Sequence, residues 1–184
     1  FIICDHHLPG AELPAAVAVL DPKRPDCTYP FKELCGCGVG FKLMQAFTAH
    51  LGLPEDALHE LLDLVAVSIA ADIVPIYGEN RTLAFHGLRL LNDRARSQRP
   101  GFEALRELAG LRETELSITS LVFGFSPRIN AAGRMGDARR AVAMLLADSA
   151  EQAKEKAGVV DKTNQERRGV DTSITREALA MIED

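Results

Sequence analysis

Residues 61–71 are almost wholly apolar, with Asp63 and Ser68 as the two polar interruptions. A helix that is apolar around its whole circumference must be covered on every side by other elements. A chain of 184 residues, 47% of them hydrophobic, can supply that cover. The sequence therefore predicts a globular protein with a real core, and excludes the disordered and collagen-like classes.

The formal net charge of the chain is −5. This charge argues against a protein that wraps nucleic acid with a general excess of positive charge, and leaves room for a local basic site. No apolar run approaches the roughly 20 residues of a membrane span, and no signal-peptide pattern opens the chain. We therefore expect a cytoplasmic protein without a membrane partner.

The four cysteines are interpreted as small buried residues in a reducing compartment, not as a disulfide framework. They are Cys4, Cys27, Cys35 and Cys37. A zinc knuckle built on Cys35 and Cys37 is the less favoured alternative, because one residue separates the pair where structural zinc sites usually place two to four.

Hydrophobic periodicity and turn residues predict two short strands followed by helices. The strands are expected at 1–4 and 16–20, and the helices at 41–51, 54–71, 82–91, 100–108, 137–147 and 149–184. The last helix would be about 50 Å long. It has few large apolar residues between 153 and 170, which favours a connector or the wall of a groove over a core element.

Both ends of the sequence lie inside predicted elements. Residues 1–4 already form a strand pattern without an initiator methionine, and residues 178–184 still have a helical pattern. We therefore expect the chain to be an excerpt of a longer protein.

Asp5, His6 and His7 directly follow the first strand. If that strand is part of a parallel sheet, these side chains emerge at the carboxyl edge, where ligands of open α/β sheets bind. A carboxylate and imidazoles together offer the mixed oxygen and nitrogen ligands that suit manganese, zinc or iron. The alternative interpretation is a polar turn with a surface histidine pair.

Asp72 closes the apolar helix of residues 61–71. A carboxylate in apolar surroundings is costly unless it is paired or bound to a metal. A negative charge is also electrostatically unfavourable at the carboxyl end of a helix. These two features favour a functional role for Asp72 over a simple helix-terminating one.

In residues 127–135 two arginines flank a predicted turn of small residues. Glycine and alanine let a backbone or a ligand approach closely, and the arginine fork matches phosphate oxygens. The alternative is a loop with two solvated arginines.

These three motifs occur in the order and approximate spacing of the DHH phosphoesterase superfamily, together with a glycine-rich segment at 36–43 and a helical segment at 161–168. The motif at 127–134 resembles in particular the exonucleases of this superfamily that are specific for single-stranded DNA. The resemblance spans essentially the whole chain and implies an α/β fold in which a parallel sheet is flanked by helices. Residues 1–147 would be the mostly helical carboxyl-terminal part of the catalytic domain, and residues 148–184 a long connector helix toward a second domain.

The resemblance also implies an activity. It is the metal-dependent removal of nucleotides from the 5′ end of single-stranded DNA, in DNA repair and recombination. Two divalent ions are implied as cofactors, Mn²⁺ foremost and Mg²⁺ as the alternative, because paired metals can activate water and stabilise both oxygens of an in-line displacement. Single-stranded DNA is the implied partner, with a single-strand-binding protein and a helicase as further partners.

Matched by motif, His6 and Asp72 resemble metal ligands, His7 resembles the residue that faces the scissile phosphate, and Asp5 supports the cluster. The residues that resemble phosphate-binding and DNA-binding positions are Arg128, Asn130, Arg134, Asn164, Gln165 and Arg167. Further aspartate motifs of the family precede the DHH strand, at which this sequence begins. We therefore expect the chain alone to be inactive.

Two other functions remain open from the sequence. One is a DHH phosphoesterase that acts on short oligonucleotides, cyclic dinucleotides or pyrophosphate. The other is a catalytically silent DHH scaffold that binds DNA or a replication partner. The arginine motif and the basic last helix favour a longer DNA strand as substrate.

Overall fold

The computed structural model describes residues 1–96 and 99–183, which fall into two compact units. Unit 1 comprises Phe1–Arg96 and Leu116–Leu121, and unit 2 comprises Ser97–Glu115 and Val122–Asp184. The domain boundary expected at residue 147 stays a prediction, and Asp184 of the predicted connector lies outside the described residues. Within the described part, no helix combines the length and hydropathy that a membrane crossing needs.

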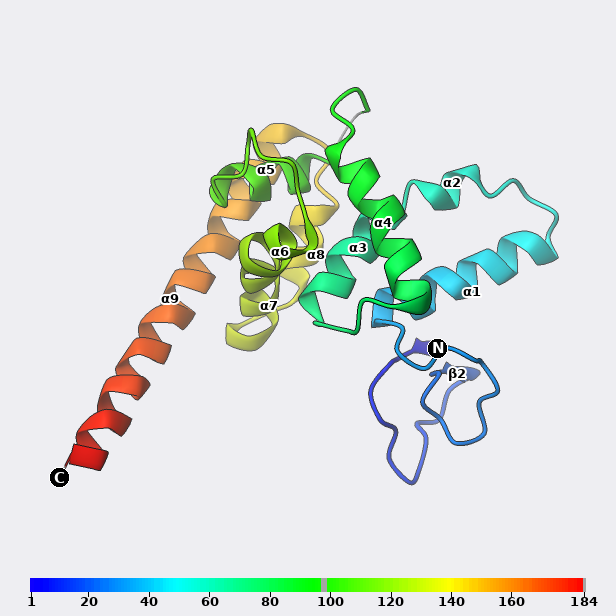
Figure 1. The fold of residues 1–184 in the computed structure, drawn as a ribbon, viewed down its shortest axis with the longest axis horizontal. Helices are drawn as coiled ribbons and strands as arrows, with labels where there is room; N and C mark the ends of the chain where they lie inside the picture. Colours follow the sequence, from blue (N-terminus) through cyan, green and yellow to red (C-terminus); the bar gives the residue numbers. More distant parts are fainter. Residues whose placement is uncertain (97–98, 184) are drawn as a thin grey trace. The chain divides into compact units, whose positions relative to one another are not determined.

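Unit 1 contains a small parallel sheet of two strands, β1 (Ile2–Cys4) and β2 (Ala18–Leu20), drawn in blue in Figure 1. The register pairs Ile2 with Ala18 and Cys4 with Leu20. One further backbone hydrogen bond, from Asp5 N to Leu20 O at 2.9 Å, extends the ladder past β1. The residue that follows β1 is thereby fixed against the neighbouring strand.

Helix α3 is covered by other helices of unit 1, as the apolar pattern predicts. The helices of this unit are α1 (Gly36–His50), α2 (Asp56–His59), α3 (Leu62–Ala71), α4 (Gly78–Asn92) and the short α6 (Ile118–Ser120). Helices α1, α4 and α6 contact α3, whose residues are mostly buried. A Cβ added to Gly87 of α4 would lie 2.1 Å from the carbonyl oxygen of Leu62, so glycine is required for this helix contact.

Three helix boundaries in unit 1 differ from the prediction, one of them at α4, which begins at Gly78 and not at Thr82. Helix α1 begins at Gly36, not at Phe41, because the thiol of Cys35 accepts a hydrogen bond from Gly38 N at 3.3 Å and caps the helix. The single helix predicted at 54–71 is interrupted between α2 and α3, so the apolar segment forms a helix of its own.

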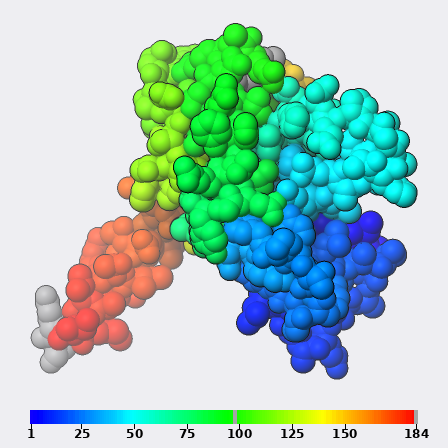
Figure 2. All heavy atoms as spheres, turned by 45° about the vertical axis from the view of Figure 1, so that its right-hand side comes forward, coloured from blue at the N-terminus to red at the C-terminus, as the bar shows by residue number. Residues whose placement is uncertain are grey.

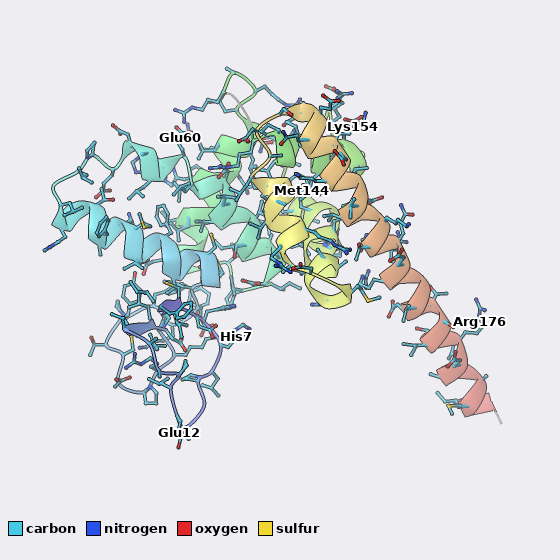
Figure 3. The ribbon with its side chains drawn as sticks, turned by 180° about the vertical axis from the view of Figure 1, so that it is seen from behind. His7, Glu12, Glu60, Met144, Lys154 and Arg176 are labelled. Atoms are coloured by element: carbon cyan, nitrogen blue, oxygen red, sulfur yellow. The ribbon has the colours of Figure 1, made fainter. Side chains whose placement is uncertain are left out.

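The elements that the structure describes in unit 2 are helices joined by short connections. After α5 (Pro100–Leu108), the π-helical turn η1 (Leu121–Phe125) leads into α7 (Ser126–Met135), α8 (Arg139–Leu145) and α9 (Ala150–Glu183). Helix α9 packs against α5, α7 and α8. Figure 3 shows Met144 of α8, which is fully buried, beside α9. The rings of Phe102 and Phe125 stack with centroids 6.1 Å apart in the same core.

The expectation that α9 contributes no core residues is wrong for its first half. Ala153, Ala157 and Val160 are fully buried, because small side chains let a helix approach its neighbours closely. The long helix itself is confirmed. From Arg168 to Ile182 every residue is exposed to solvent, and Figure 2 shows this second half of the helix in orange to red.

The prediction of a turn at 127–134 is also wrong, because these residues form helix α7. Pro127 is the second residue of α7 and directly follows the π-helical turn η1. Ala131 and Ala132 are buried, so the small residues of this motif serve close helix packing instead of a bend in the chain.

Candidate active site

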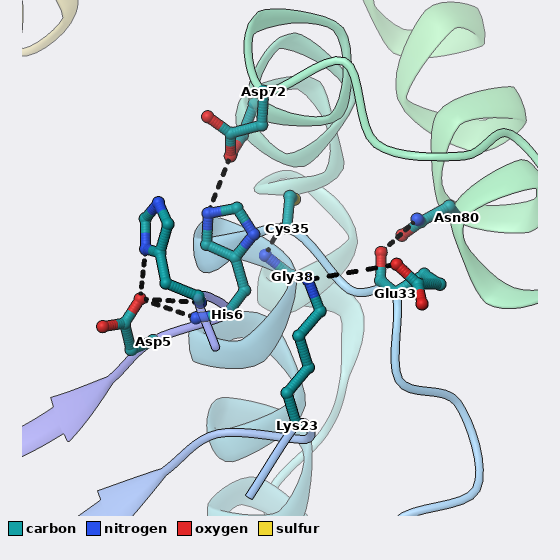
Figure 4. Close-up of polar contacts among 10 residues, drawn as sticks. Asp5, His6, Lys23, Glu33, Cys35, Gly38, Asp72 and Asn80 are labelled. Atoms are coloured by element: carbon teal, nitrogen blue, oxygen red, sulfur yellow. Dashed lines mark hydrogen bonds and ion pairs between the residues drawn. The ribbon is translucent and has the colours of Figure 1, made fainter. Parts of the chain in front are cut away.

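His6 and Asp72 come together although 65 residues lie between them in the sequence. His6 follows β1, and Asp72 is the residue that caps the carboxyl end of α3. His6 Nε2 lies 3.6 Å from Asp72 Oδ2, as the dashed line between them in Figure 4 marks. The His6 side chain is 14% exposed and that of Asp72 is 34% exposed. The Asp72 side chain is therefore accessible to solvent, and the expectation that it is embedded in apolar surroundings is wrong.

The surroundings of this pair fix both side chains. A Cβ added to Gly36, at the start of α1, would lie 3.5 Å from Cδ2 of His6, so the imidazole packs against the beginning of that helix. The hydroxyl of Ser68, one turn earlier on α3, donates a long hydrogen bond of 3.4 Å to Asp72 Oδ2. The imidazole and the carboxylate are thus oriented toward each other by two different helices.

The thiol of Cys35, drawn beside this pair in Figure 4, is neutral. Cys35 is fully buried, and its burial raises the pKa of the thiol. All four cysteines are free, so no disulfide framework exists. Cys4 and Cys27 are half-buried, whereas Cys37 is exposed, so the prediction of a buried residue is wrong for Cys37.

Asp5 and His7 form a second pair. Oδ1 of Asp5 lies 2.7 Å from Nδ1 of His7 and accepts hydrogen bonds from the backbone N–H groups of His6 and His7. The hydrogen bond from the His7 side chain is the main reason why the pKa of Asp5 is lowered to about 2. The His7 side chain is 78% exposed, and its ring centroid lies 4.4 Å from that of His6. Asp5 therefore orients an accessible imidazole beside the His6–Asp72 pair.

One divalent ion fits the His6–Asp72 pair. Two atoms 3.6 Å apart can both reach an ion at the usual ligand distances of about 2.1–2.2 Å. An imidazole nitrogen and a carboxylate oxygen are a suitable donor set for Mn²⁺. Among the described residues, however, no group of three or more His, Cys, Asp or Glu side chains could hold a metal. These residues supply two ligands to one ion, and the remaining ligands must come from water, substrate or other protein groups.

Residues 1–69 match the family model described as the DHH family, N-terminal domain. This part of the chain is similar to the DHH family. The chain is similar to the single-stranded-DNA-specific exonuclease RecJ of Bacillus subtilis, with 43% identity over 99% of this chain and 22% of the relative. It is 40% identical to RecJ of Escherichia coli over 99% of this chain and 33% of that protein. The chain thus spans a fifth to a third of the length of these relatives.

Solved structures agree with this assignment. A crystal structure of exonuclease RecJ bound to manganese superposes with a TM-score of 0.80 at 35% identity, covering 98% of this chain and 44% of that chain. RecJ of Thermus thermophilus in complex with Mn²⁺ superposes with a TM-score of 0.81 at 33% identity, covering 97% of this chain and 26% of that chain. The resemblance and the fold class stated from the sequence are confirmed.

The six predicted phosphate and DNA contacts lie in unit 2, whereas the two pairs of the DHH site lie in unit 1. Arg128 is 16% exposed and uses its guanidinium internally: Nε donates to Asp161 Oδ1 at 2.7 Å, Nη1 to Gly124 O at 2.7 Å and Nη2 to Leu108 O at 3.0 Å. Arg128 therefore joins α7 to α9 and to the end of α5.

The other five predicted residues differ in accessibility. Asn164 is 5% exposed and accepts a hydrogen bond of 3.4 Å from Nε of the half-buried Arg167. Gln165 is exposed and donates to Asp161 Oδ2 at 2.7 Å. Arg134 is exposed at the end of α7, and Asn130 is half-buried in its middle. Arg134 is thus the arginine of this motif that a ligand in solution can reach.

Two residues of structural importance were missed by the sequence analysis. Asp161 accepts hydrogen bonds from Arg128 and Gln165. The sequence signal for the second contact was the spacing of four residues between Asp161 and Gln165 on one helix, at which side chains are neighbours. Asn80, in the first turn of α4, is fully buried, and its Nδ2 donates to Glu33 O at 2.6 Å and to Pro75 O at 3.0 Å. Asn80 ties the segment after Asp72 to the segment before α1, and no sequence pattern indicates this contact.

Proposed function

We propose that this chain is the part of a 5′ to 3′ exonuclease for single-stranded DNA that carries the DHH metal site. The observation that carries the proposal is the approach of His6 Nε2 to Asp72 Oδ2, within 3.6 Å, at the end of a strand in a DHH-family segment. The similarity to RecJ over nearly the whole chain supports single-stranded DNA as substrate.

In this proposal the two pairs have different tasks. His6 and Asp72 hold a divalent ion, Mn²⁺ or Mg²⁺, as the RecJ structures bound to these ions suggest. When bound, such ions activate water and stabilise the charge on the phosphate oxygens. Asp5 accepts a hydrogen bond from Nδ1–H of His7, which leaves Nε2 of an exposed imidazole free to approach the scissile phosphate.

The residues of unit 2 would contact the DNA strand. Arg134 and Gln165 are accessible and would meet phosphate oxygens directly. Asn130 and Arg167 are half-buried and would contribute at the edge of that surface, while Arg128 and Asn164 would support it from within. Phosphate contacts of this kind tolerate any base sequence, which suits an exonuclease.

The cellular setting is part of the same proposal. An exonuclease for single-stranded DNA would act in the cytoplasm, in DNA repair and recombination. A second ion would be held with ligands outside this chain, because the described residues supply two ligands for one ion. A helicase that exposes single strands and a single-strand-binding protein that covers them are the partners such an enzyme needs.

The experiment compares Asp72→Asn with Asp93→Asn in the whole protein. Both residues cap the carboxyl end of a helix in unit 1, but Asp93 pairs with Arg96, whereas Asp72 pairs with His6. Labelled single-stranded DNA is incubated with Mn²⁺, and labels at either end report the polarity of cleavage. We expect Asp72→Asn to abolish hydrolysis and retain DNA binding, and Asp93→Asn to remain active.

Near-normal turnover of Asp72→Asn at saturating Mn²⁺ would contradict the metal-ligand role. Parallel reactions with a dinucleotide, a cyclic dinucleotide and pyrophosphate test the substrate class. Faster turnover of any of these than of the long single strand would replace the exonuclease by a small-substrate phosphoesterase.

A further inference from the structure

Ile73, the residue after Asp72, has an unusual backbone conformation. Its φ is 53°, and among the described residues it is the one non-glycine residue with a positive φ. Asp72 is the cap of α3, so Ile73 occupies the position after the cap. Helices commonly place a left-handed residue there, but usually glycine or asparagine. A β-branched residue in this conformation is a genuine outlier that costs conformational energy.

Burial does not compensate for this cost. The Ile73 side chain is 76% exposed, so it does little for the core of unit 1. Glycine at the same position would adopt the left-handed conformation without strain. Ile73 is therefore a large apolar side chain at a surface position where glycine would give a more stable folded state.

Residues on either side of Ile73 hold it in this conformation. The backbone N–H of Ile73 donates to Ala70 O at 3.4 Å, which ends the helix. Two residues later, Pro75 O accepts from Nδ2 of Asn80, and the same Nδ2 donates to Glu33 O. The fully buried Asn80, seen with Glu33 in Figure 4, thus fixes the segment that presents Ile73.

We propose that Ile73 is a substrate-contacting residue that packs against the sugar or base of the nucleotide held at the His6–Asp72 pair. The inference rests on the proposed function. Consecutive Cα atoms are about 3.8 Å apart, so Ile73 lies within one residue of the carboxylate that faces His6. The faces of nucleobases are apolar and independent of sequence, so an exposed aliphatic side chain can contact any of them.

Ile76 provides a matched control. It is an exposed isoleucine on the same loop, 43% exposed, but its backbone is not in the left-handed region. Ile73→Gly and Ile73→Asn both accept the left-handed conformation and remove the apolar side chain, whereas Ile73→Val retains its β-branched shape. Ile76→Ala removes a similar apolar surface three residues away.

The test uses the whole protein, Mn²⁺ and a 5′-labelled oligothymidylate. We expect Ile73→Gly to raise the melting temperature and to raise KM about fivefold, with a smaller effect on kcat and unchanged Mn²⁺ affinity. Ile73→Asn should raise KM to a similar extent, whereas Ile73→Val and Ile76→Ala should keep KM close to that of the wild type.

An unchanged KM in both Ile73→Gly and Ile73→Asn would overturn the proposal, as would an equal rise in KM for Ile76→Ala. A wild-type protein that does not cleave the oligothymidylate would instead overturn the proposed function, and this inference with it. The two failures are distinguished because the wild type is measured first.

Discussion

Arg128 of α7 and Asp161 of α9 form an ion pair, with Nε of the arginine 2.7 Å from Oδ1 of the carboxylate. Both side chains are about one-sixth exposed, and each has a further hydrogen-bond partner in unit 2. Removing one member of such a pair leaves the other charge partly desolvated and without its partner. The arginine predicted to bind phosphate therefore has a structural role that must be separated from any role in DNA binding.

Arg128→Ala is expected to lower the free energy of unfolding of the protein by about 2–4 kcal/mol, because three internal hydrogen bonds are lost with the ion pair. Urea unfolding of Arg128→Ala, Asp161→Asn and the double variant measures this loss, and the double variant should be less destabilised than the sum of the two. Arg139→Ala is the control, since Arg139 is 90% exposed and should contribute little. Equal stability of Arg128→Ala and wild type would contradict the prediction.

Arg134→Ala should affect DNA binding without this loss of stability. If Arg134 contacts one phosphate, its removal reduces the slope of log affinity against log salt by about 0.7 for single-stranded DNA. Fluorescence anisotropy at several salt concentrations measures the slope, again with Arg139→Ala as control. An unaltered slope in Arg134→Ala would show that this exposed arginine does not meet the strand.

Gly87→Ala is expected to disrupt unit 1. The new Cβ would lie 2.1 Å from Leu62 O and 2.6 Å from the Cβ of Ala66, so α3 and α4 would have to separate. We expect a loss of about 3 kcal/mol or more, at or beyond the upper end for overpacked cores, because one of the clashing atoms belongs to the backbone. Gly40→Ala in α1 meets nothing within 4 Å and should instead stabilise the protein by about 0.5–1 kcal/mol. Thermal unfolding of the two variants should therefore shift in opposite directions.

The 184-residue chain, prepared without additional sequence, should not hydrolyse single-stranded DNA. Its described residues contain no group of three metal-binding side chains, and His6 with Asp72 would hold a single ion weakly. The assay is the release of label from 5′-labelled DNA in excess Mn²⁺. Cleavage by this chain that disappears in its Asp72→Asn variant would show that these residues are sufficient after all.

Local signals predicted much of the fold. Helix α5 begins at Pro100 and ends at Leu108, as expected, because proline in the first turn marks a helix start. The start of α1 was missed because residues 36–40 are rich in glycine, and the cap is a cysteine thiol. Cysteine is not among the usual capping residues, so no sequence rule indicated it.

The arginine motif shows where local reasoning fails. Glycine and alanine in residues 131–133 favour a turn when the segment is considered alone, although small residues also allow one helix to approach another. In the structure Ala131 and Ala132 are buried in unit 2, so tertiary packing decided between the two interpretations.

For the candidate site, the motifs identified Asp5, His6, His7 and Asp72, but not how they pair. His6 and His7 meet different carboxylates, Asp72 and Asp5, although their ring centroids lie 4.4 Å apart. The carboxylate that His6 meets depends on the position of α3 relative to β1. That position is set by burial of the apolar helix, and no local pattern encodes it.

Helix α9 is one continuous element with two different sources of stability. Its first half is held by buried contacts with α5, α7 and α8, whereas from Arg168 to Ile182, where Figure 3 labels Arg176, its residues are exposed. An isolated helical segment of this length is only marginally stable in water. Amide hydrogens should therefore exchange slowly near Val160 and progressively faster toward Met181, so the helix unwinds from its far end inward. Any partner that covers the second half would slow exchange there and extend the cooperative unit along the helix.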